Sequence, residues 1–548
     1  MGRHIMEETV NTISVISMGA KGDGVTDDTQ AFTDALEYLK SIGGGILEVP
    51  AKETSYLLDG HVVLVDNVTI RSNGAVIEKK ASSTGYYAFI SLSGTKQGYG
   101  SGASNISFEG LTFKGDFSIK KSFNFTLHHS SDVTFRNCKF IQCVIAGHAI
   151  DLGGCQNVVI DNCEFYGFYP QTGSEYKEAI QVDHSTASGN TGMDDPASYD
   201  GLPTINVSVT NCKFLPVTVD GTEYPSPHPF GSHSVVEKQA LSNLLFRDNL
   251  VKGAPAYPTA SGSTNFATGW VHFYGAEDVR VINNEFINID SRSSRAIGVW
   301  TKDTGIPLNQ VNVTSPTQTS DVTMAPKNIT ISGNVFRGFN SADGTSIIYL
   351  SGKMVNTTPY YVTGATIEKN TFTDCFSTSG TDDNRSSDCV QLDYVKSALL
   401  DGNKGFSIRR LLYATNSSMI KVVNSQLTGA YYIPISINTC SDLDISHNHL
   451  QDFIVGFYFR DNDGMSVVSN SFRNGSPSTG YGAAVLFKGC SYLQVKNNIL
   501  PGKPNNNVGT GISLYGACSK ALVKDNLIYN YADYKIYVSS DSTDVTTS

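Results

Sequence analysis

The stretch VTFRNCKF (133–140) holds the pattern that decides the fold: alternating apolar residues, an Asn, and an apolar residue three positions later. Alternating apolar residues are typical of short strands with one buried face, and a recurring unit indicates a solenoid. We therefore expect an all-β fold, a parallel β-helix in which each repeat belongs to one coil. The pattern recurs as VVIDNCEF (158–165), VSVTNCKF (207–214), VRVINNEF (279–286), ITISGNVF (329–336), ATIEKNTF (365–372), LDISHNHL (443–450), SVVSNSF (466–472), LQVKNNIL (493–500) and ALVKDNLI (521–528).

The spacing of the repeats indicates where the solenoid carries loops. The Asn after each strand tolerates a left-handed conformation and can hydrogen-bond to its counterpart one coil away. Long gaps indicate loops inserted into a coil, which is where solenoid proteins build binding sites. The longest insertions lie between residues 165 and 335. We therefore place the functional face in region 61–420 and interpret 421–548 as compact C-terminal coils.

The composition argues against several classes of protein. The chain has 548 residues, a formal net charge of −11 and only 17% charged residues. A solenoid can reach this length because its core grows along one axis. The acidic balance argues against nucleic acid or an anionic membrane surface as the partner, and no apolar stretch is long enough to span a bilayer. We expect no cofactor.

The ten cysteines contain no CxxC pair. Cys138, Cys163 and Cys212 each follow an Asn within the repeated pattern. Small residues stacked at one position of successive coils are typical of a buried core. We interpret the cysteines as buried free thiols rather than disulfides, and we expect no metal site.

The N-terminal segment follows a different pattern. We interpret MGRHIM as vector-derived and residues 1–11 as a disordered lead-in to a cap over residues 12–60. Asp27 and Gln30 predict a capping box for a helix at 27–42, which three glycines end. The strand ILEVP (46–50) is then the first of the fold. This helix is expected to cover the open end of the solenoid.

The opening stretch ISMGAKGDGVTDDTQAFTDALEYLKSIGGGILEVPA (16–51) resembles that of the pectin-lyase-like β-helix superfamily. Members include polygalacturonases, phage tailspikes that degrade exopolysaccharides, and alginate epimerases. The resemblance implies a right-handed parallel β-helix over nearly the whole chain and a polysaccharide as the ligand. The reaction has to be inferred from the site, because this fold carries hydrolases, lyases and epimerases.

The densest polar cluster lies on two consecutive coils, GHAIDLGG (147–154) and KEAIQVDHS (177–185). Strand alternation points Asp151, Gln181 and Asp183 outward. Stacked coils lie roughly 4.8 Å apart, so Asp151 should lie over Gln181, with Asp183 one step along the same face.

Glu178 has the inward parity of its strand, so it reaches this face only from a bend. Two interpretations stay open: a catalytic carboxylate, or a bend carboxylate bound by backbone N–H groups. Carboxylates gathered on one face suit glycoside hydrolysis, in which one acid protonates the leaving oxygen and another carboxylate activates water or attacks the sugar. Like charges this close push the two pKa values apart.

Polygalacturonases have a similar order of parts, namely an Asp, an acidic pair on the next coil, a Gly-flanked His and an Arg/Lys strand. The residues that match here are Asp151, Glu178 with Asp183, His233 in GSHS (231–234), and Arg295 with Lys302 in RAIGVWTK (295–302). This chain departs in having Ala-Ile-Asp for Asn-Thr-Asp, a split acidic pair, and Ser-His-Ser for Gly-His-Gly. The resemblance implies Asp151, Glu178, Asp183 and His233 as catalytic residues of a comparable site.

Further polar and aromatic residues in the same region are candidates for substrate binding. Aromatic rings stack on sugars, and side chains such as Arg donate paired hydrogen bonds to them. The candidates are His148, Gln181, His184, Tyr199, His272, Arg295, Trp300 and Lys302, with Tyr166, Tyr169, Tyr176, His228, Trp270 and Arg292 nearby. A second motif, DCVQLDY (388–394), points Gln391 and Asp393 outward. We interpret it as a solvated face or a secondary sugar subsite, since no comparable histidine or aromatic cluster is expected around it.

Three functions fit these residues. The working prediction is an endo-acting glycoside hydrolase that cleaves a bacterial capsular polysaccharide or exopolysaccharide. The tailspike resemblance then implies a homotrimer and an extracellular or virion-associated location. The first alternative is a polysaccharide lyase on uronic acids, which needs a base and a cation such as Arg295 or Lys302 beside the carboxylate. The second is a non-catalytic glycan-binding adhesin.

Overall fold

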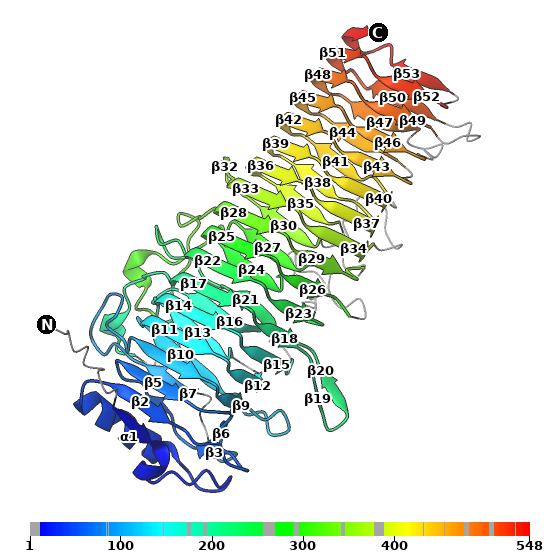
Figure 1. Ribbon diagram of the computed structural model, residues 1–548. Coiled ribbons are helices and arrows are strands. Elements are labelled where there is room, and N and C mark those ends of the chain that lie inside the picture. The colour runs from blue at the N-terminus through cyan, green and yellow to red at the C-terminus, as the bar shows by residue number, and fades with distance from the viewer. Residues whose placement is uncertain are drawn as a thin grey trace, which may run out of the picture. The chain divides into compact units, whose positions relative to one another are not determined.

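The computed structural model describes residues 11–548 except 84, 86, 146, 172–176, 190–193, 256–268, 290–294, 341–345, 377–387, 431, 454, 476–481, 503–508 and 532. The chain divides into two compact units. The first unit is Met1–Leu245 with Ile306–Gln318, and the second is Phe246–Gly305 with Thr319–Ser548. Within each unit, short strands pair in parallel into three sheets, and successive strands of a coil enter sheets A, B and C in turn (Figure 1). This is the predicted parallel β-helix.

The first unit holds the helices and the early coils. Its helices are η1 (Val15–Met18), α1 (Thr29–Ser41), η2 (Pro196–Ser198) and η3 (Leu308–Gln310). Sheet A contains β1 (Thr12–Ser14), β2 (Gly45–Glu48), β5 (Val68–Arg71), β8 (Ile106–Glu109), β11 (Ser131–Arg136), β14 (Gln156–Asp161), β17 (Ile205–Thr210) and β22 (Ser242–Arg247), whose end crosses into the second unit. Sheet B contains β3 (Tyr56–Leu58), β6 (Val76–Lys79), β9 (Thr112–Lys114), β12 (Lys139–Val144), β15 (Glu164–Phe168) and β18 (Lys213–Leu215). Sheet C contains β4 (Val62–Val63), β7 (Tyr87–Ser91), β10 (Asn124–His128), β13 (Ile150–Gly153), β16 (Glu178–Asp183) and β21 (His228–Gly231), and a hairpin joins β19 (Val217–Val219) to β20 (Thr222–Tyr224).

The second unit repeats the same coil. Sheet A contains β25 (Glu277–Ile282), β28 (Lys327–Ser332), β33 (Val362–Glu368), β36 (Val395–Asp401), β39 (Ser418–Val423), β42 (Ser441–Ser446), β45 (Asp463–Val468), β48 (Ser491–Lys496), β51 (Ser519–Lys524) and β54 (Thr543–Thr547). Sheet B contains β23 (Leu250–Lys252), β26 (Glu285–Ile287), β29 (Val335–Arg337), β34 (Thr371–Cys375), β37 (Lys404–Ile408), β40 (Gln426–Ala430), β43 (His449–Gln451), β46 (Ser471–Arg473), β49 (Ile499–Pro501) and β52 (Leu527–Tyr529). Sheet C contains β24 (Val271–Tyr274), β27 (Ile297–Trp300), β30 (Ile348–Ser351), β35 (Val390–Asp393), β38 (Leu412–Thr415), β41 (Ile435–Asn438), β44 (Phe457–Arg460), β47 (Ala483–Lys488), β50 (Thr510–Tyr515) and β53 (Tyr534–Val538), and a hairpin joins β31 (Lys353–Val355) to β32 (Thr358–Tyr360).

The core of each unit is built from the apolar positions of the repeat. In the first unit the rings of Phe140, Phe165 and Phe214 stack with centroids 4.6 and 4.8 Å apart. In the second unit Phe336 stacks in the same way on the rings one coil before and one coil after it. Parallel pairing in register places one residue type over itself, and the stacked rings bury a continuous apolar column.

The corner after each sheet A strand has a left-handed residue followed by a buried one. Asn137 and Asn162 have φ of 55° and 52°, and the side chain of Asn162 donates to Asn137 Oδ1 across 2.7 Å, as predicted. In the second unit the buried position is itself an Asn. The backbone N–H and side-chain amide of Asn334 both donate to Asn370 Oδ1 at 3.0 Å. The single Asn of the sequence pattern thus occupies two different positions, of which the pattern anticipated one.

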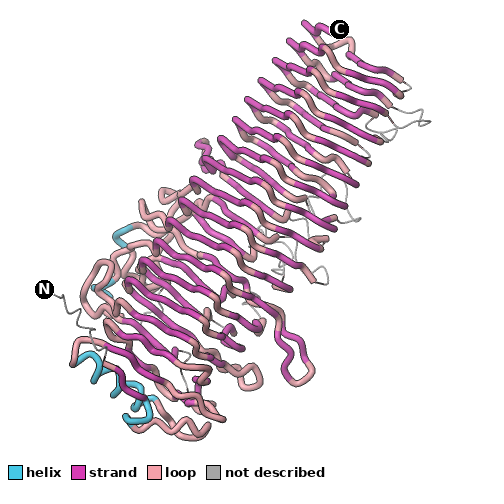
Figure 2. Tube along the Cα trace, viewed as in Figure 1, coloured by secondary structure: helices cyan, strands magenta, loops and turns pink. Residues whose placement is uncertain are grey.

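The N-terminal helix α1 packs on the first coils, as expected for a cap (Figure 2). Its apolar face is buried, and the ring of Phe32 lies 5.9 Å from that of Tyr56. The predicted capping box is wrong: the N-cap is Asp28, and the side chain of Gln30 donates to Asp34, one turn further along the helix. ILEVP is also not the first strand, because β1 precedes it and pairs with β2.

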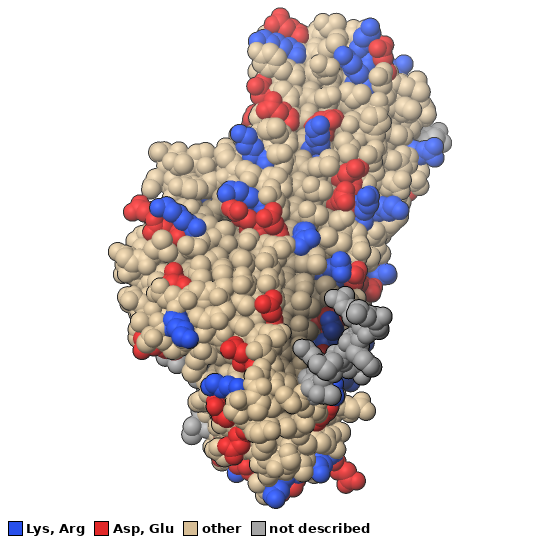
Figure 3. All heavy atoms as spheres, turned by 60° about the vertical axis from the view of Figure 1, so that its left-hand side comes forward, with Lys and Arg blue, Asp and Glu red and all other residues tan. Residues whose placement is uncertain are grey.

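All ten cysteines are buried and free, as predicted. Acidic and basic side chains are interspersed over the face drawn in Figure 3, and most of that face is uncharged. Among the residues that the structure describes, no helix is long and apolar enough to cross a membrane.

Candidate functional site

Two carboxylates lie on neighbouring strands of sheet C in the first unit. The parallel pairing of β13 with β16 sets Asp151 opposite Gln181 and Gly153 opposite Asp183, which is the predicted register. Both carboxylates are nearly enclosed, with Asp151 7% and Asp183 3% exposed. They therefore interact in a region from which most water is excluded, where a charge affects its neighbours strongly.

Asp183 is held in its ionised form. Its Oδ1 accepts the backbone N–H of His184 at 2.8 Å and the hydroxyl of Ser234, and its Oδ2 accepts the amide of Gln181 at 3.2 Å. Burial opposes the charge, but the hydrogen bonds and charge of His184, with the bond from Ser234, outweigh it and lower the pKa of Asp183 below 3.8.

Asp151 is in the opposite state. Burial, with the nearby negative charge of Asp183, raises its pKa from 3.8 to about 8. Its Oδ1 is buried and has no hydrogen-bond partner among the described residues. Asp151 therefore keeps its proton at neutral pH, and a buried polar atom without a partner indicates a place for a ligand.

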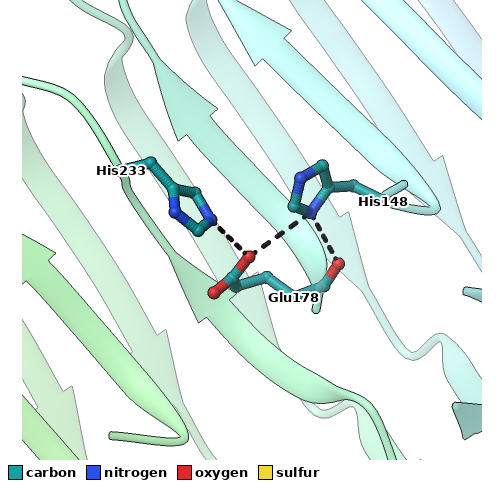
Figure 4. Close-up of side chains that lie close together, drawn as sticks. All are labelled: His148, Glu178 and His233. Carbon is teal, nitrogen blue, oxygen red and sulfur yellow. Dashed lines mark hydrogen bonds and ion pairs between the residues drawn. The ribbon is translucent and has the colours of Figure 1, made fainter. Parts of the chain in front are cut away.

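Glu178 joins two histidines from different coils (Figure 4). The sequence analysis expected Glu178 at a bend before the strand, which is wrong: it is the first residue of β16, and its side chain is completely buried, in line with its inward parity. Its Oε2 accepts a hydrogen bond from His233 Nε2 at 2.8 Å and lies 3.4 Å from His148 Nδ1. His148 Nδ1 also lies 2.9 Å from the backbone oxygen of Glu178. Sequence spacing gave no sign of this three-residue cluster.

The two imidazoles differ in their protonation. Burial lowers the pKa of His148 to about 3, against the opposing charge of Glu178. Burial also disfavours the charged form of His233, but the charge and hydrogen bond of Glu178 outweigh burial and raise its pKa above 6.5. His233 thus holds the carboxylate of Glu178 as an ion pair, and its side chain is 32% exposed.

Three loops of the first unit lie around the carboxylates. The first follows β16 and begins at His184, the second follows β21 and contains Val236 and Gln239, and the third contains Ile306 and Val311. His184 Nε2 donates to the backbone oxygen of Gln239 at 2.8 Å, and the N–H of Ala187 donates to the backbone oxygen of Val311. Val236, Ile306 and Val311 form a small apolar cluster that joins the second and third loops. The predicted binding residue His184 therefore fixes a loop, and it does so while binding Asp183.

A pair of histidines that the sequence analysis did not single out anchors the first of these loops. His128 Nδ1 lies 2.7 Å from Asp194 Oδ2, and His129 Nε2 lies 3.0 Å from Asp200 Oδ1. The two imidazoles stack with centroids 4.1 Å apart. The only sequence signal was the adjacent pair of histidines, because their carboxylate partners are far along the chain.

Four predicted binding residues, His272, Arg295, Trp300 and Lys302, lie in the second unit, on β24, β27 and the segments beside them. The indole of Trp300 lies over Gly298, where a Cβ would come within 1.6 Å of the ring. The ring of Tyr274 meets Trp300 edge-on at 5.2 Å. Arg295 lies 4.7 Å from the Tyr349 ring centroid, and Lys302 Nζ lies 5.0 Å from that of Tyr274. We call Tyr274, Arg295, Trp300, Lys302 and Tyr349 the aromatic platform.

Several candidates are placed differently from the expectation. Tyr199 is buried, with its ring 5.0 Å from that of His128, so it packs the loop instead of facing a sugar. Trp270 is a core residue whose ring packs on Phe339. His272 has outward parity but is fully buried, stacked at 6.3 Å on the indole of Trp300.

Other candidates contact partners outside the site, or lie outside the described residues. Tyr166 donates to Glu164, and Tyr169 packs on Phe117. His228 is fully buried and lies opposite Glu178 in the sheet register. Tyr176 and Arg292 lie outside the described residues.

The second acidic motif also differs from the expectation. Gln391 lies in register between Tyr349 and Tyr413 of the adjacent coils, so aromatic neighbours do surround it. Asp393 Oδ1 accepts the hydroxyl of Thr415 at 2.7 Å. The motif has aromatic rings, as a secondary subsite would, although its carboxylate already has a partner.

Comparison with known proteins identifies the class of the fold. Residues 123–268 and 388–548, more than half of the chain, match the family model described as the right handed beta helix region. The chain therefore belongs to the right-handed parallel β-helix family, as its opening motif predicted.

Individual relatives are more distant. The plasmin and fibronectin-binding protein A of Streptococcus pneumoniae is 26% identical over 365 residues, covering 61% of this chain and 46% of that protein. The chain thus spans about half the length of this curated relative. The structure of the S. pneumoniae surface protein and adhesin PfbA aligns with a TM-score of 0.56 and 20% identity, over 85% of this chain and 100% of that chain. A family 28 exopolygalacturonase of Yersinia enterocolitica aligns with a TM-score of 0.44 and 13% identity, over 88% of this chain and 78% of that chain.

Proposed function

We propose that this protein is a glycoside hydrolase that cleaves polysaccharide chains at sheet C of its first unit. The observation that carries the proposal is the pair Asp151 and Asp183, two carboxylates on adjacent strands whose pKa values are shifted in opposite directions. Two carboxyl groups held in different protonation states supply the acid and the base that hydrolysis of a glycosidic bond needs.

Asp151 is the general acid in this proposal. It is protonated at neutral pH, and its buried Oδ1 has no hydrogen-bond partner among the described residues, so its hydrogen-bonding capacity is unused in this structure. Proton donation by a placed acid contributes about 10² to 10⁴ in rate. The ionised Asp183 then activates water or attacks the sugar, and His184, Ser234 and Gln181 fix the orientation of its carboxylate.

Glu178 and His233 act as positioning residues in this scheme. Glu178 is completely buried and its Oε2 accepts the hydrogen bond of His233, so we assign its carboxylate to holding His233. The pair lies beside the carboxylates and influences Asp151 through its charge. This refines the sequence-based hypothesis, in which both residues were catalytic.

The aromatic platform of the second unit is proposed to hold a glycan chain. The indole of Trp300 and the ring of Tyr274 offer flat apolar surfaces that stack on pyranose rings. Lys302 adds positive charge beside those rings, which favours an acidic sugar. Arg295, predicted to bind substrate, is only 2% exposed and packs against the rings of Trp300 and Tyr349. An extracellular or surface location agrees with such a ligand, and PfbA, to which this chain is similar, is a surface protein. The expected homotrimer and virion association remain predictions from the tailspike resemblance.

The second candidate function is adhesion without catalysis. The relative that is 26% identical is described as a plasmin and fibronectin-binding protein, so a non-catalytic role is a specific alternative. In that case the buried carboxylates only stabilise the loops above them. The two candidates differ in whether the Asp151 proton is ever transferred.

Reducing-end release from a panel of purified bacterial and uronic acid polysaccharides separates the candidates. We expect the wild type to shorten at least one polysaccharide, and Asp151→Asn and Asp183→Asn each to lose that activity while still binding it. Asp132→Asn is the matched control, because Asp132 is exposed on β11 of the same unit and its left-handed φ of 56° suits Asn. Products that absorb near 235 nm (roughly) would indicate a lyase by elimination, and equal activity in wild type and both variants would refute the assignment.

A further inference from the structure

The geometry points to a binding site for one divalent transition-metal ion, of the zinc class, formed by His148, Glu178 and His233. The three residues come from three successive coils of the first unit. His148 precedes β13, Glu178 begins β16 and His233 follows β21. Each side chain turns toward the same point, and the carboxylate lies between the two imidazoles (Figure 4).

The separations of the donor atoms fit one ion. One donor atom from each residue lies within 4.8 Å of the other two. Glu178 Oε2 is 2.8 Å from His233 Nε2 and 3.4 Å from His148 Nδ1. In a tetrahedral zinc site with bonds of about 2.0–2.1 Å, neighbouring donor atoms lie roughly 3.3 Å apart. Two of the three edges are therefore close to the bound geometry, and the third, between the two imidazoles, is no longer than 4.8 Å.

The donor set selects the class of ion. Two imidazole nitrogens and one carboxylate oxygen are borderline ligands that suit zinc and its neighbours, whereas calcium and magnesium prefer oxygen donors alone. Three protein ligands leave one position of a tetrahedral ion for water or a substrate oxygen. The side chain of His233 is 32% exposed, so the site has an approach from solvent.

Ion binding replaces two existing contacts. His148 Nδ1 is 2.9 Å from the backbone oxygen of Glu178, and the ion replaces this contact together with the bond between His233 and Glu178. Glu178 is completely buried, and a buried carboxylate needs compensation by a cation or by hydrogen bonds. A divalent ion supplies that compensation directly.

The donor set excludes Asp151 and Asp183, the acid and base of the proposed function, and shares with it the positioning residues Glu178 and His233. The test titrates the metal-free full chain with Zn²⁺ by calorimetry, and with Co²⁺ by visible absorption. We expect one ion per chain and an intense Co²⁺ d–d band typical of four-coordination. Ca²⁺ and Mg²⁺ should not compete.

Variants assign the binding to these residues. Glu178→Gln keeps the shape of the side chain. His233→Ala changes a partly exposed loop residue, so it still provides the test if Glu178→Gln fails to fold. We expect each to weaken Zn²⁺ binding by at least about 100-fold, the upper range for losing even an indirect partner of a ligand. His61→Ala, an exposed histidine of the same unit, should bind as the wild type does.

Two results would overturn the site: no stoichiometric Zn²⁺ or Co²⁺ binding by the wild type, or unchanged affinity in the folded His233→Ala variant. Asp151→Asn separates this test from the proposed function. This variant should lose hydrolysis and still bind one ion. Retained hydrolysis in it would count against the proposed function alone, and missing Zn²⁺ binding by the wild type would count against the metal site alone.

Discussion

Replacing Asp151 by Asn should change how the stability of the protein depends on pH. The pKa of the Asp151 carboxyl is raised from 3.8 to about 8 in the folded protein, chiefly by burial. Between these values the folded chain keeps the proton and the unfolded chain has released it. The unfolded state therefore binds fewer protons, and the free energy of unfolding of the wild type falls as pH rises through this window.

The size of the effect follows from the shift. One pKa unit corresponds to about 1.4 kcal/mol, so a shift of roughly four units costs on the order of 6 kcal/mol once Asp151 is ionised. Asn carries no proton to lose. The difference in unfolding free energy between Asp151→Asn and wild type should thus grow by about 1.4 kcal/mol per pH unit between roughly pH 5 and 8.

Thermal unfolding of both proteins across this pH range measures the difference. The melting temperature of Asp151→Asn should rise relative to that of wild type as the pH increases. The control Asp132→Asn changes an exposed carboxylate of the same unit, and its gap from wild type should vary little. A gap for Asp151→Asn that stays constant from pH 5 to 8 would refute the raised pKa, and with it the role of Asp151 as a proton donor.

Five further predictions test the site and the core. Asp183→Asn should lower kcat by about 10² to 10⁴ with little change in glycan affinity, as measured by reducing-end assay and calorimetry. Hydrolysis by the wild type should decline above a pH of about 8, where Asp151 loses its proton, and a flat pH–rate profile to pH 10 would contradict this. Phe165→Ala opens a cavity in a ring stack and should cost about 3–5 kcal/mol, whereas Asn334→Ala leaves buried amide partners unsatisfied and should cost about 1–3 kcal/mol, both measured by denaturant unfolding. Trp300→Ala should weaken glycan binding by about 0.5–1.5 kcal/mol, and unchanged affinity would remove the aromatic platform from the account.

The fold was predictable because its determinants are local and repeated. The column of Phe140, Phe165 and Phe214 follows directly from the apolar position of each repeat. The register that sets Asp151 opposite Gln181 follows from strand alternation, since a slip of either strand by one residue would turn its own polar side chain into the core. The sequence pattern predicted only part of the corner after each sheet A strand. There a left-handed residue is followed by a buried residue that stacks between coils, and Asn is suited to both positions.

The site was predictable only where it lies on strands. The loops that border Asp183 are fixed by partners distant in sequence, such as the pairing of His184 with Gln239. Tyr199 was expected to face a sugar, but its hydroxyl accepts the backbone N–H of Asp194 and its ring packs on that of His128. The cluster of His148 with His233 has no spacing motif, because each residue comes from a different coil and only the stacking of coils brings them together.

The measurement that tests the central claim most directly is hydrolysis of a responsive oligosaccharide in H₂¹⁸O, followed by mass spectrometry of the products. Hydrolysis by Asp151 and Asp183 predicts one ¹⁸O atom for each bond cleaved by wild type, and intact oligosaccharide with Asp151→Asn or Asp183→Asn. Unlabelled unsaturated products, or labelled products formed equally by these variants, would contradict the account.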